Sequence, residues 1–164
     1  MESIPLDKRS GKIWFNGKAI EWKNAQIHVL NHGLHYASCV FEGERVYDGE
    51  IFRLAEHTER LFYSAERMGI KVPYSKKEIN DACKNIVNVQ KVQNGYVRPV
   101  IWRGSEMMAI SAQKNKIHVA IATWEWGSYF DPKLKLNGIK LNISSWRRPA
   151  PNTIPWDTKA AGLY

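Results

Sequence analysis

Two turn dipeptides, each set between short apolar runs, constrain this chain more than any other feature. Asn16-Gly17 interrupts the run 13–20, and Asp48-Gly49 interrupts the run 45–53. Asn-Gly and Asp-Gly favour two-residue β-turns because these residues adopt positive φ at low cost, and such turns join antiparallel strands. The sequence therefore predicts two β-hairpins. Between them, residues 26–47 favour further strands with tight turns over a long helix.

Two amphipathic helices are predicted after the second hairpin. The first starts near Glu56 and ends at Gly69, where glycine can adopt the left-handed conformation that closes a helix. The second begins at Ser75, which forms a capping-box pair with Glu78. Its apolar stripe comprises Ile79, Ala82, Cys83, Ile86 and Val87. We therefore interpret Cys83 as a core residue.

Three β-rich runs follow, at residues 96–102, 117–124 and 139–146. Pro99 is expected at a strand edge or a bulge, because proline cannot donate a ladder hydrogen bond. Residues 127–132 are the predicted linker. The predicted fold class is α+β, with a small N-terminal domain, residues 1–130, of mostly antiparallel sheet and two helices. Residues 131–164 are too few to bury a core of their own, so we expect an interdomain linker and the incomplete start of a second domain.

Composition excludes several classes of protein. The 164 residues are 44% hydrophobic and 24% charged, which is typical of a globular chain. The longest apolar runs are a few residues, far short of the roughly 20 that cross a bilayer, and the polar start lacks the apolar region of a signal peptide. Cys39 and Cys83 are too few for a disulfide framework, so we expect a reducing, cytoplasmic setting.

The net charge of +8 raises the question of a nucleic-acid or membrane-surface partner. Because the basic residues are scattered and interleaved with acidic ones, and no basic recognition motif is present, we expect neither partner. A basic excess also suits a site for phosphorylated or carboxylate ligands. A non-catalytic binding or assembly fragment that uses this basic surface stays open as an alternative.

Metal and hydrolase chemistry are not favoured. His28, His32 and His35 would align on a helix, but Gly33 and the β-branched residues nearby argue against a helix there. No carboxylate or cysteine stands at ligand spacing, so we expect hydrogen-bonded structural histidines and no metal. Neither a nucleophile-elbow motif nor a glycine-rich phosphate loop is present.

Lys159 is the strongest candidate for chemistry. It stands beside the small residues Ala160, Ala161 and Gly162, which would let a flat cofactor lie against the backbone. A lysine that serves only solubility needs no such clearance. This setting favours a nucleophilic amine that forms a Schiff base.

Four motifs extend this interpretation. They are the runs 35–43, 52–61, 96–99 and 149–162, which occur in this order over nearly the whole chain. Together they resemble the branched-chain amino acid aminotransferases, which belong to fold type IV of the pyridoxal-phosphate enzymes. The resemblance implies pyridoxal 5′-phosphate as cofactor, and it implies that residues 131–164 begin a larger, barrel-like β/α domain that binds this cofactor. It also implies that Lys159 is the catalytic, cofactor-linked lysine, that Arg60 binds the phosphate, and that Tyr164 hydrogen-bonds the cofactor's phenolic oxygen.

The resemblance also implies substrate contacts. Tyr96 and Arg98 alternate along a strand and so share one face, and their family counterparts hold the carboxylate end of the substrate. Tyr36, Phe41 and Tyr129 match aromatic positions that line the side-chain pocket. An apolar pocket accepts leucine, isoleucine or valine, and an arginine near its rim can accommodate the second carboxylate of glutamate.

The expected activity is transfer of the amino group of L-leucine, L-isoleucine or L-valine to 2-oxoglutarate, in a homodimer or larger homo-oligomer. D-amino acid aminotransferases and aminodeoxychorismate lyases share the fold and remain alternatives. In the family, the carboxylate that pairs with the pyridine nitrogen and most of the phosphate cradle follow the lysine, and both are absent from these 164 residues. We therefore expect this polypeptide alone to be inactive and the intact protein to be the transaminase.

Overall fold

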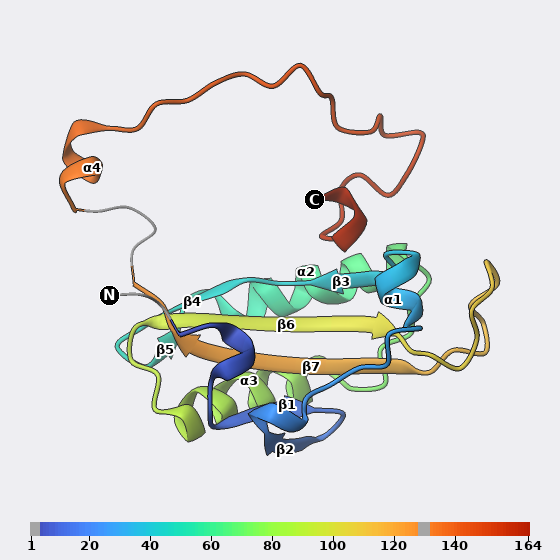
Figure 1. Cartoon of the computed structure of the whole chain (residues 1–164), viewed down its shortest axis with the longest axis horizontal. Coiled ribbons are helices and arrows are strands. Elements are labelled where there is room, and N and C mark those ends of the chain that lie inside the picture. Colours follow the sequence, from blue (N-terminus) through green and yellow to red (C-terminus); the bar gives the residue numbers. More distant parts are fainter. Residues whose placement is uncertain (1–3, 128–131) are drawn as a thin grey trace.

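A computed structural model of the chain describes residues 4–127 and 132–164, and its centre is one antiparallel sheet (Figure 1). The strand order is β2-β1-β7-β6-β4-β5, and β3 also pairs with β6. The strands are β1 (Lys12–Phe15), β2 (Lys18–Glu21), β3 (Cys39–Phe41), β4 (Glu44–Tyr47), β5 (Glu50–Ile51), β6 (Gly95–Arg103) and β7 (Ile117–Glu125). The long pair β6 and β7 forms the middle of the sheet.

Both predicted hairpins are confirmed. β1 pairs with β2 across Asn16 and Gly17, whose φ angles are 48° and 91°. β4 pairs with β5 across Asp48 and Gly49, whose φ angles are 49° and 81°. Positive φ at both central residues is the signature of the turn that matches the twist of a hairpin.

The prediction that Pro99 lies at a strand edge or a bulge is wrong. It lies in the middle of β6, opposite Ile121 of β7, and its carbonyl oxygen accepts a hydrogen bond from the Glu42 N–H at 2.9 Å. The proline nitrogen cannot return a bond to Glu42, so the ladder breaks there. The break separates β3 from β4, which pair with β6 on either side of it in one continuous register.

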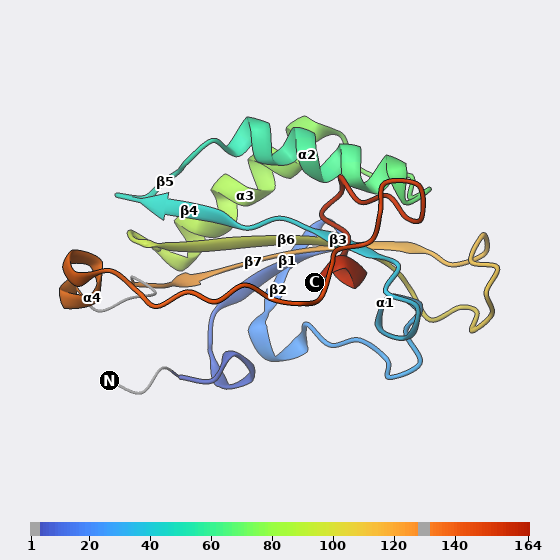
Figure 2. The ribbon, with the colours of Figure 1, turned by 90° about the horizontal axis from the view of Figure 1, so that it is seen from above.

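Two long helices cover one face of the sheet (Figure 2). α2 (Leu54–Arg67) begins two residues before the predicted start, and Gly69 after it has φ 62°. α3 (Lys76–Gln90) begins with the predicted capping box of Ser75 and Glu78. The predicted stripe of α3, Cys83 included, is buried together with apolar residues of the central strands. These contacts form the core.

The segment before β3 contains a helix that the sequence did not predict, the single turn α1 (His32–His35). The histidines are hydrogen-bonded, as expected: His32 contacts the Ser38 hydroxyl at 2.6 Å and the Ala109 carbonyl oxygen at 3.0 Å. His28 accepts from the Leu30 N–H, and His35 contacts the Val29 carbonyl oxygen. The short 3-10 turns η1 (Leu6–Lys8) and η2 (Trp22–Asn24) flank the first hairpin.

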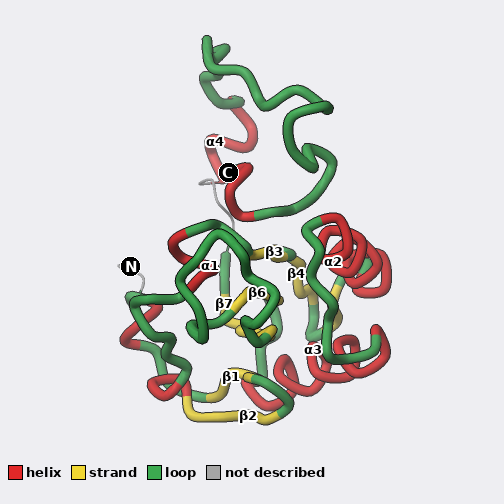
Figure 3. Tube along the Cα trace, turned by 90° about the vertical axis from the view of Figure 1, so that its right-hand side faces the viewer, coloured by secondary structure: helices red, strands yellow, loops and turns green. Residues whose placement is uncertain are grey.

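The predicted strand at 139–146 is wrong. Those residues form neither helix nor strand, and side chains such as Ile143 and Trp146 are at least 90% exposed. The segment follows α4 (Pro132–Asn137) and leads to η3 (Ala161–Leu163). It runs apart from the sheet and returns to it near the C-terminus (Figures 1 and 3).

The fold class is α+β, as predicted, with a mostly antiparallel sheet and few helices. On the face of the sheet opposite α2 and α3, here called the open face, loop residues Ala25 and Ile27 and the C-terminal Ala161 border a pocket over the strands, and the returning segment meets the sheet at β3. Among the described residues, none of the helices has the length and apolar character needed to span a bilayer. The predicted linker falls partly on residues 128–131, which lie outside the described residues.

Candidate active site

The backbone of Lys159 is held between α2 and β3. Its N–H donates to the hydroxyl of Ser64 on α2 at 2.9 Å, and its carbonyl oxygen accepts from the Phe41 N–H at 3.2 Å. The next residue, Ala160, forms an antiparallel bridge with Val40 and is 4% exposed. The returning segment thus pairs with the outer edge of β3. Hydrogen bonds to α2 on one side and to β3 on the other hold the backbone of Lys159.

Two aromatic rings surround the amine of Lys159. The Nζ atom lies 3.3 Å from the hydroxyl oxygen of Tyr164, 4.9 Å from the centre of that ring and 4.7 Å from the centre of the Phe41 ring. Phe41 and Tyr164 meet edge to face at 5.3 Å. The site residues predicted at 41, 159 and 164 are therefore brought together. An amine within hydrogen-bond distance of a phenol can exchange a proton with it directly.

Tyr96 and Arg98 join the same cluster through Phe41. The Arg98 guanidinium lies 4.6 Å from the centre of the Phe41 ring and 5.2 Å from that of Tyr96, and it donates to the Tyr96 hydroxyl at 3.2 Å. The predicted shared face of these two residues agrees with this contact. A cationic donor and a phenol side by side suit a carboxylate ligand.

Gly43 is required for this arrangement. A Cβ atom at position 43 would lie 1.7 Å from the Tyr96 hydroxyl oxygen, a distance that no real contact reaches. The Tyr96 phenol therefore occupies space that only glycine leaves open. The Phe41-Glu42-Gly43 run thus places the Phe41 ring on the open face of the sheet and leaves space beside Gly43 for the Tyr96 phenol.

Arg60 reaches the cluster from α2. Its Nε and Nη2 atoms donate to the two carboxylate oxygens of Glu42 at 2.5 and 2.8 Å. Burial of Glu42 opposes ionisation, but the hydrogen bonds from Arg60 and His57 outweigh it, so the pKa of the Glu42 carboxyl is lowered. The pKa of Arg60 is raised, foremost by the bond to Glu42, with the nearby Tyr164 phenol contributing least.

Two predicted site residues are not placed in the cluster. Tyr36 follows α1, is 47% exposed, and stacks on His32 with ring centres 4.5 Å apart. The contacts of the described residues do not connect Tyr36 directly with Lys159. Tyr129 lies outside the described residues.

Sequence reasoning missed several residues that support the site. Glu42 holds Arg60 and His57 holds Glu42, Ser64 holds the backbone of Lys159, and a hydrogen bond joins Tyr63 to Asp157 two residues before the lysine. Strand alternation could have revealed Glu42, because it shares the core face with Val40 and is 0% exposed. The contacts across α2 had no comparable signal.

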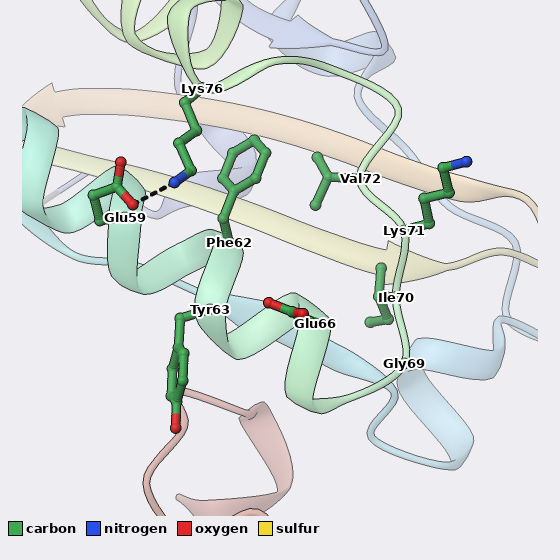
Figure 4. A pocket seen from close by; sticks show the side chains of 9 residues that line it. All are labelled: Glu59, Phe62, Tyr63, Glu66, Gly69, Ile70, Lys71, Val72 and Lys76. Carbon is green, nitrogen blue, oxygen red and sulfur yellow. Dashed lines mark hydrogen bonds and ion pairs between the residues drawn. The ribbon is translucent and has the colours of Figure 1, made fainter.

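Two pockets flank these elements. One, of about 410 Å³, lies on the open face of the sheet and is mainly apolar, with Arg98 and Ala161 on its wall beside Phe15, Val100 and Trp102. The other, of about 580 Å³, lies between α2 and the segment that precedes α3, around Phe62 and Ile70 (Figure 4). An ion pair of Glu59 and Lys76 crosses its rim. Of these two pockets, the first contains a residue of the predicted site and the second does not.

The residues present fit pyridoxal 5′-phosphate. Lys159 offers an amine, Tyr164 offers a phenol next to it, and Arg60 keeps one edge of its guanidinium for a phosphate. Of the small residues that follow the lysine, Ala161 lines the apolar pocket, whereas Ala160 is buried against Val40. The donor set therefore matches an aldehyde, a phenolic oxygen and a dianion in one ligand.

Comparison with known proteins agrees with this geometry. Residues 39–159 match the model of the family described as amino-transferase class IV. The branched-chain-amino-acid aminotransferase of Pseudomonas aeruginosa is 42% identical over 165 residues, which cover 98% of this chain and 54% of the relative. The chain thus spans about half the length of the curated relatives it matches.

Solved structures give the same result. The T.th. branched-chain amino acid aminotransferase with pyridoxamine 5′-phosphate has a TM-score of 0.89 and 35% identity, covering 95% of this chain and 53% of its own. The same enzyme complexed with N-(5′-phosphopyridoxyl)-L-glutamate has a TM-score of 0.83 and 34% identity, covering 95% and 51%. The cluster of side chains around Lys159 and the family match over most of the chain agree with each other. The chain belongs to the class IV aminotransferase family.

Proposed function

We propose that the protein is a pyridoxal-phosphate-dependent transaminase that moves the amino group of L-leucine, L-isoleucine or L-valine to 2-oxoglutarate. The observation that carries this proposal is the position of the Lys159 amine, 3.3 Å from the Tyr164 hydroxyl and against the Phe41 ring, with Arg60 on the neighbouring helix. The names of the relatives support the substrate class. The glutamate adduct in one solved relative supports glutamate and 2-oxoglutarate as the second pair.

Pyridoxal phosphate, when bound, supplies an aldehyde for the amine and an electron-withdrawing ring. In this proposal Lys159 holds the cofactor and moves a proton at its Nζ atom. Tyr164 donates to the cofactor's phenolic oxygen, and Arg60 binds the phosphate. Arg98 and Tyr96 orient a substrate carboxylate, while Phe41, with Tyr36 and Tyr129, excludes water from the apolar side chain.

We further propose the division into residues 1–130, a small α+β domain, and residues 131–164, a linker leading into the cofactor domain. In support, the buried core is built mainly from residues 40–121, with Ala160 as its member from the C-terminal segment, whereas side chains of 139–146 are exposed. The expectation that the 164 residues alone are inactive belongs to this proposal. A homo-oligomer and a cytoplasmic setting belong to the same proposal.

Reductive trapping tests the proposal. The protein is mixed with pyridoxal 5′-phosphate, treated with borohydride and digested, and the labelled peptide is identified by mass. We expect the label on Lys159, its loss in Lys159→Ala, and its retention in Lys140→Ala, which removes an exposed lysine of the same segment. A label spread over surface lysines, and unchanged in Lys159→Ala, would refute the assignment. Turnover assays of the intact protein with L-leucine and with D-alanine would separate the branched-chain activity from the D-amino acid alternative.

A further inference from the structure

We propose that Glu42 and His57 are positioning residues that orient Arg60 to receive a phosphate group. This inference rests on the proposed function, since it concerns the phosphate of the cofactor. Glu42 belongs to the Phe41-Glu42-Gly43 run, whose acidic member the substrate and cofactor roles leave unexplained. His57 stands one turn before Arg60 on α2, so both side chains leave the same face of the helix.

The guanidinium of Arg60 has two usable edges. Glu42 occupies the Nε and Nη2 edge with two hydrogen bonds of 2.5 and 2.8 Å. The other edge, formed by Nη1 and the second Nη2 proton, has no partner among the described residues. The Arg60 side chain is 53% exposed, and the Tyr164 phenol lies near enough to affect its pKa. One edge is therefore anchored, and the other remains for two phosphate oxygens.

Glu42 is itself held firmly. Its side chain is 0% exposed, and besides Arg60 its Oε2 atom accepts from His57 Nδ1 at 2.9 Å and from the Gly43 N–H at 3.3 Å. The carboxylate lies on the core face of the sheet, where Pro99 interrupts the ladder, and cannot follow the arginine into solvent. A long arginine fixed at this anchor loses little further freedom when it binds an anion.

The anchor has an opposing electrostatic effect. The negative charge of Glu42 lowers the attraction of Arg60 for a phosphate, whereas its two hydrogen bonds restrict the side chain to one direction. If the pair of Glu42 and Arg60 only stabilises the fold, removal of the negative charge of Glu42 should tighten phosphate binding. A positioning role predicts weaker binding. The sign of the change therefore decides between them.

The test compares the affinity of the full chain for pyridoxal 5′-phosphate with its affinity for pyridoxal, which lacks the phosphate. The ratio of the affinity for pyridoxal 5′-phosphate to the affinity for pyridoxal isolates phosphate recognition from the reaction with Lys159. Glu42→Gln keeps the size of the side chain but presents an amide N–H₂ to one of its donors. We expect the ratio to fall about tenfold, the loss typical of one charge-assisted hydrogen bond. An unchanged or larger ratio would overturn the proposal.

His57 provides a matched pair of variants. His57→Leu removes the third hydrogen bond to Glu42, and we expect the ratio to fall about threefold, since the anchor remains but is less rigid. His57→Asn places an amide N–H near the position of Nδ1 and is expected to restore the ratio. Equal ratios in the two variants would contradict the role of His57. If Glu42→Gln fails to fold, this pair still decides the question.

Inorganic phosphate makes the test independent of the lysine chemistry. In the wild-type chain, the Arg60 Nε–H signal in ¹⁵N NMR should be protected from exchange, and the signals of the guanidinium should shift as phosphate is added. In Glu42→Gln the protection should be lost and the phosphate shift weakened. If borohydride trapping does not label Lys159 yet these shifts appear, the proposed function fails and the positioning role stands. If phosphate produces no shift in the wild type, the positioning role fails.

Discussion

Replacing Glu44 with glutamine should make the protein more stable at neutral and alkaline pH. Glu44 is 1% exposed, and neither of its carboxyl oxygens has a hydrogen-bond partner among the described residues. Burial, and secondarily the negative charge of Glu42, raises the pKa of Glu44 from 4.5 to about 8. The folded protein therefore keeps this carboxyl protonated at pH 7, while the unfolded chain releases the proton.

The sign and size of the effect follow from this difference. Between about pH 4.5 and about pH 8 the folded state holds one proton more than the unfolded state, so stability falls as the pH rises. The loss is about 1.4 kcal/mol for each pH unit, or roughly 5 kcal/mol over the whole window as an upper bound. Above about pH 8 both states are ionised at this position, and the loss stops growing.

Glutamine carries the same shape without the titration. At about pH 5 the two proteins should differ by about 1 kcal/mol or less, because a protonated carboxyl and an amide bury similar polar atoms. By about pH 8.5 the Glu44→Gln protein should be more stable by on the order of 3 to 5 kcal/mol. The opposite shift of Glu42 acts below its usual pKa of 4.5, outside this window.

Urea unfolding followed by tryptophan fluorescence, repeated at several pH values, measures this difference directly. Glu50→Gln is the matched control, because Glu50 is an exposed glutamate of the same hairpin and its variant should follow the wild-type profile. Parallel profiles for the wild type and Glu44→Gln would refute the reasoning. They would mean that the Glu44 carboxyl finds a charge partner or solvent that its position in the core does not provide.

Three further predictions concern local packing. Gly43→Ala should destabilise the protein by about 1–3 kcal/mol in thermal unfolding, because its Cβ collides with the Tyr96 phenol; adding Tyr96→Phe should recover part of the loss, and no recovery would place the strain elsewhere. Ser64→Ala should cost about 1 kcal/mol and speed hydrogen exchange at the Lys159 amide, whereas unchanged exchange would deny the anchoring bond. Ser75→Ala should cost about 1 kcal/mol by removing the capping box, with Ser75→Asp retaining most of the stability as its control.

Much of the fold could be predicted from local patterns. The turns at Asn16-Gly17 and Asp48-Gly49 and the cap at Ser75 depend on neighbours within a few residues, so their conformations follow from intrinsic preferences. The run at 139–146 shows the limit of the same patterns. Its alternation is typical of a strand, but no strand edge lies beside it in the described part of the chain, so its backbone has no partner there with which to form one.

Pro99 shows the same limit from the opposite side. A rule for proline that considers one strand alone places Pro99 at an edge. In the structure Pro99 lies inside β6, and its missing N–H faces the gap between β3 and β4. Similarly, the match of motifs predicted Lys159, Arg60 and Tyr164 as site residues, but it could not predict the buried Glu42 that contacts the arginine.

The sequence by itself determined the hairpins, the two amphipathic helices and the identity of the candidate reactive lysine, because these depend on residue types at short spacing. Only the tertiary structure decided which distant groups meet. Ser64 contacts the backbone of Lys159 across 95 positions of sequence, and Glu42 contacts Arg60 across 18. Such pairings arise when the sheet and α2 pack into one core, and burial then forces each polar group to find a partner at close range.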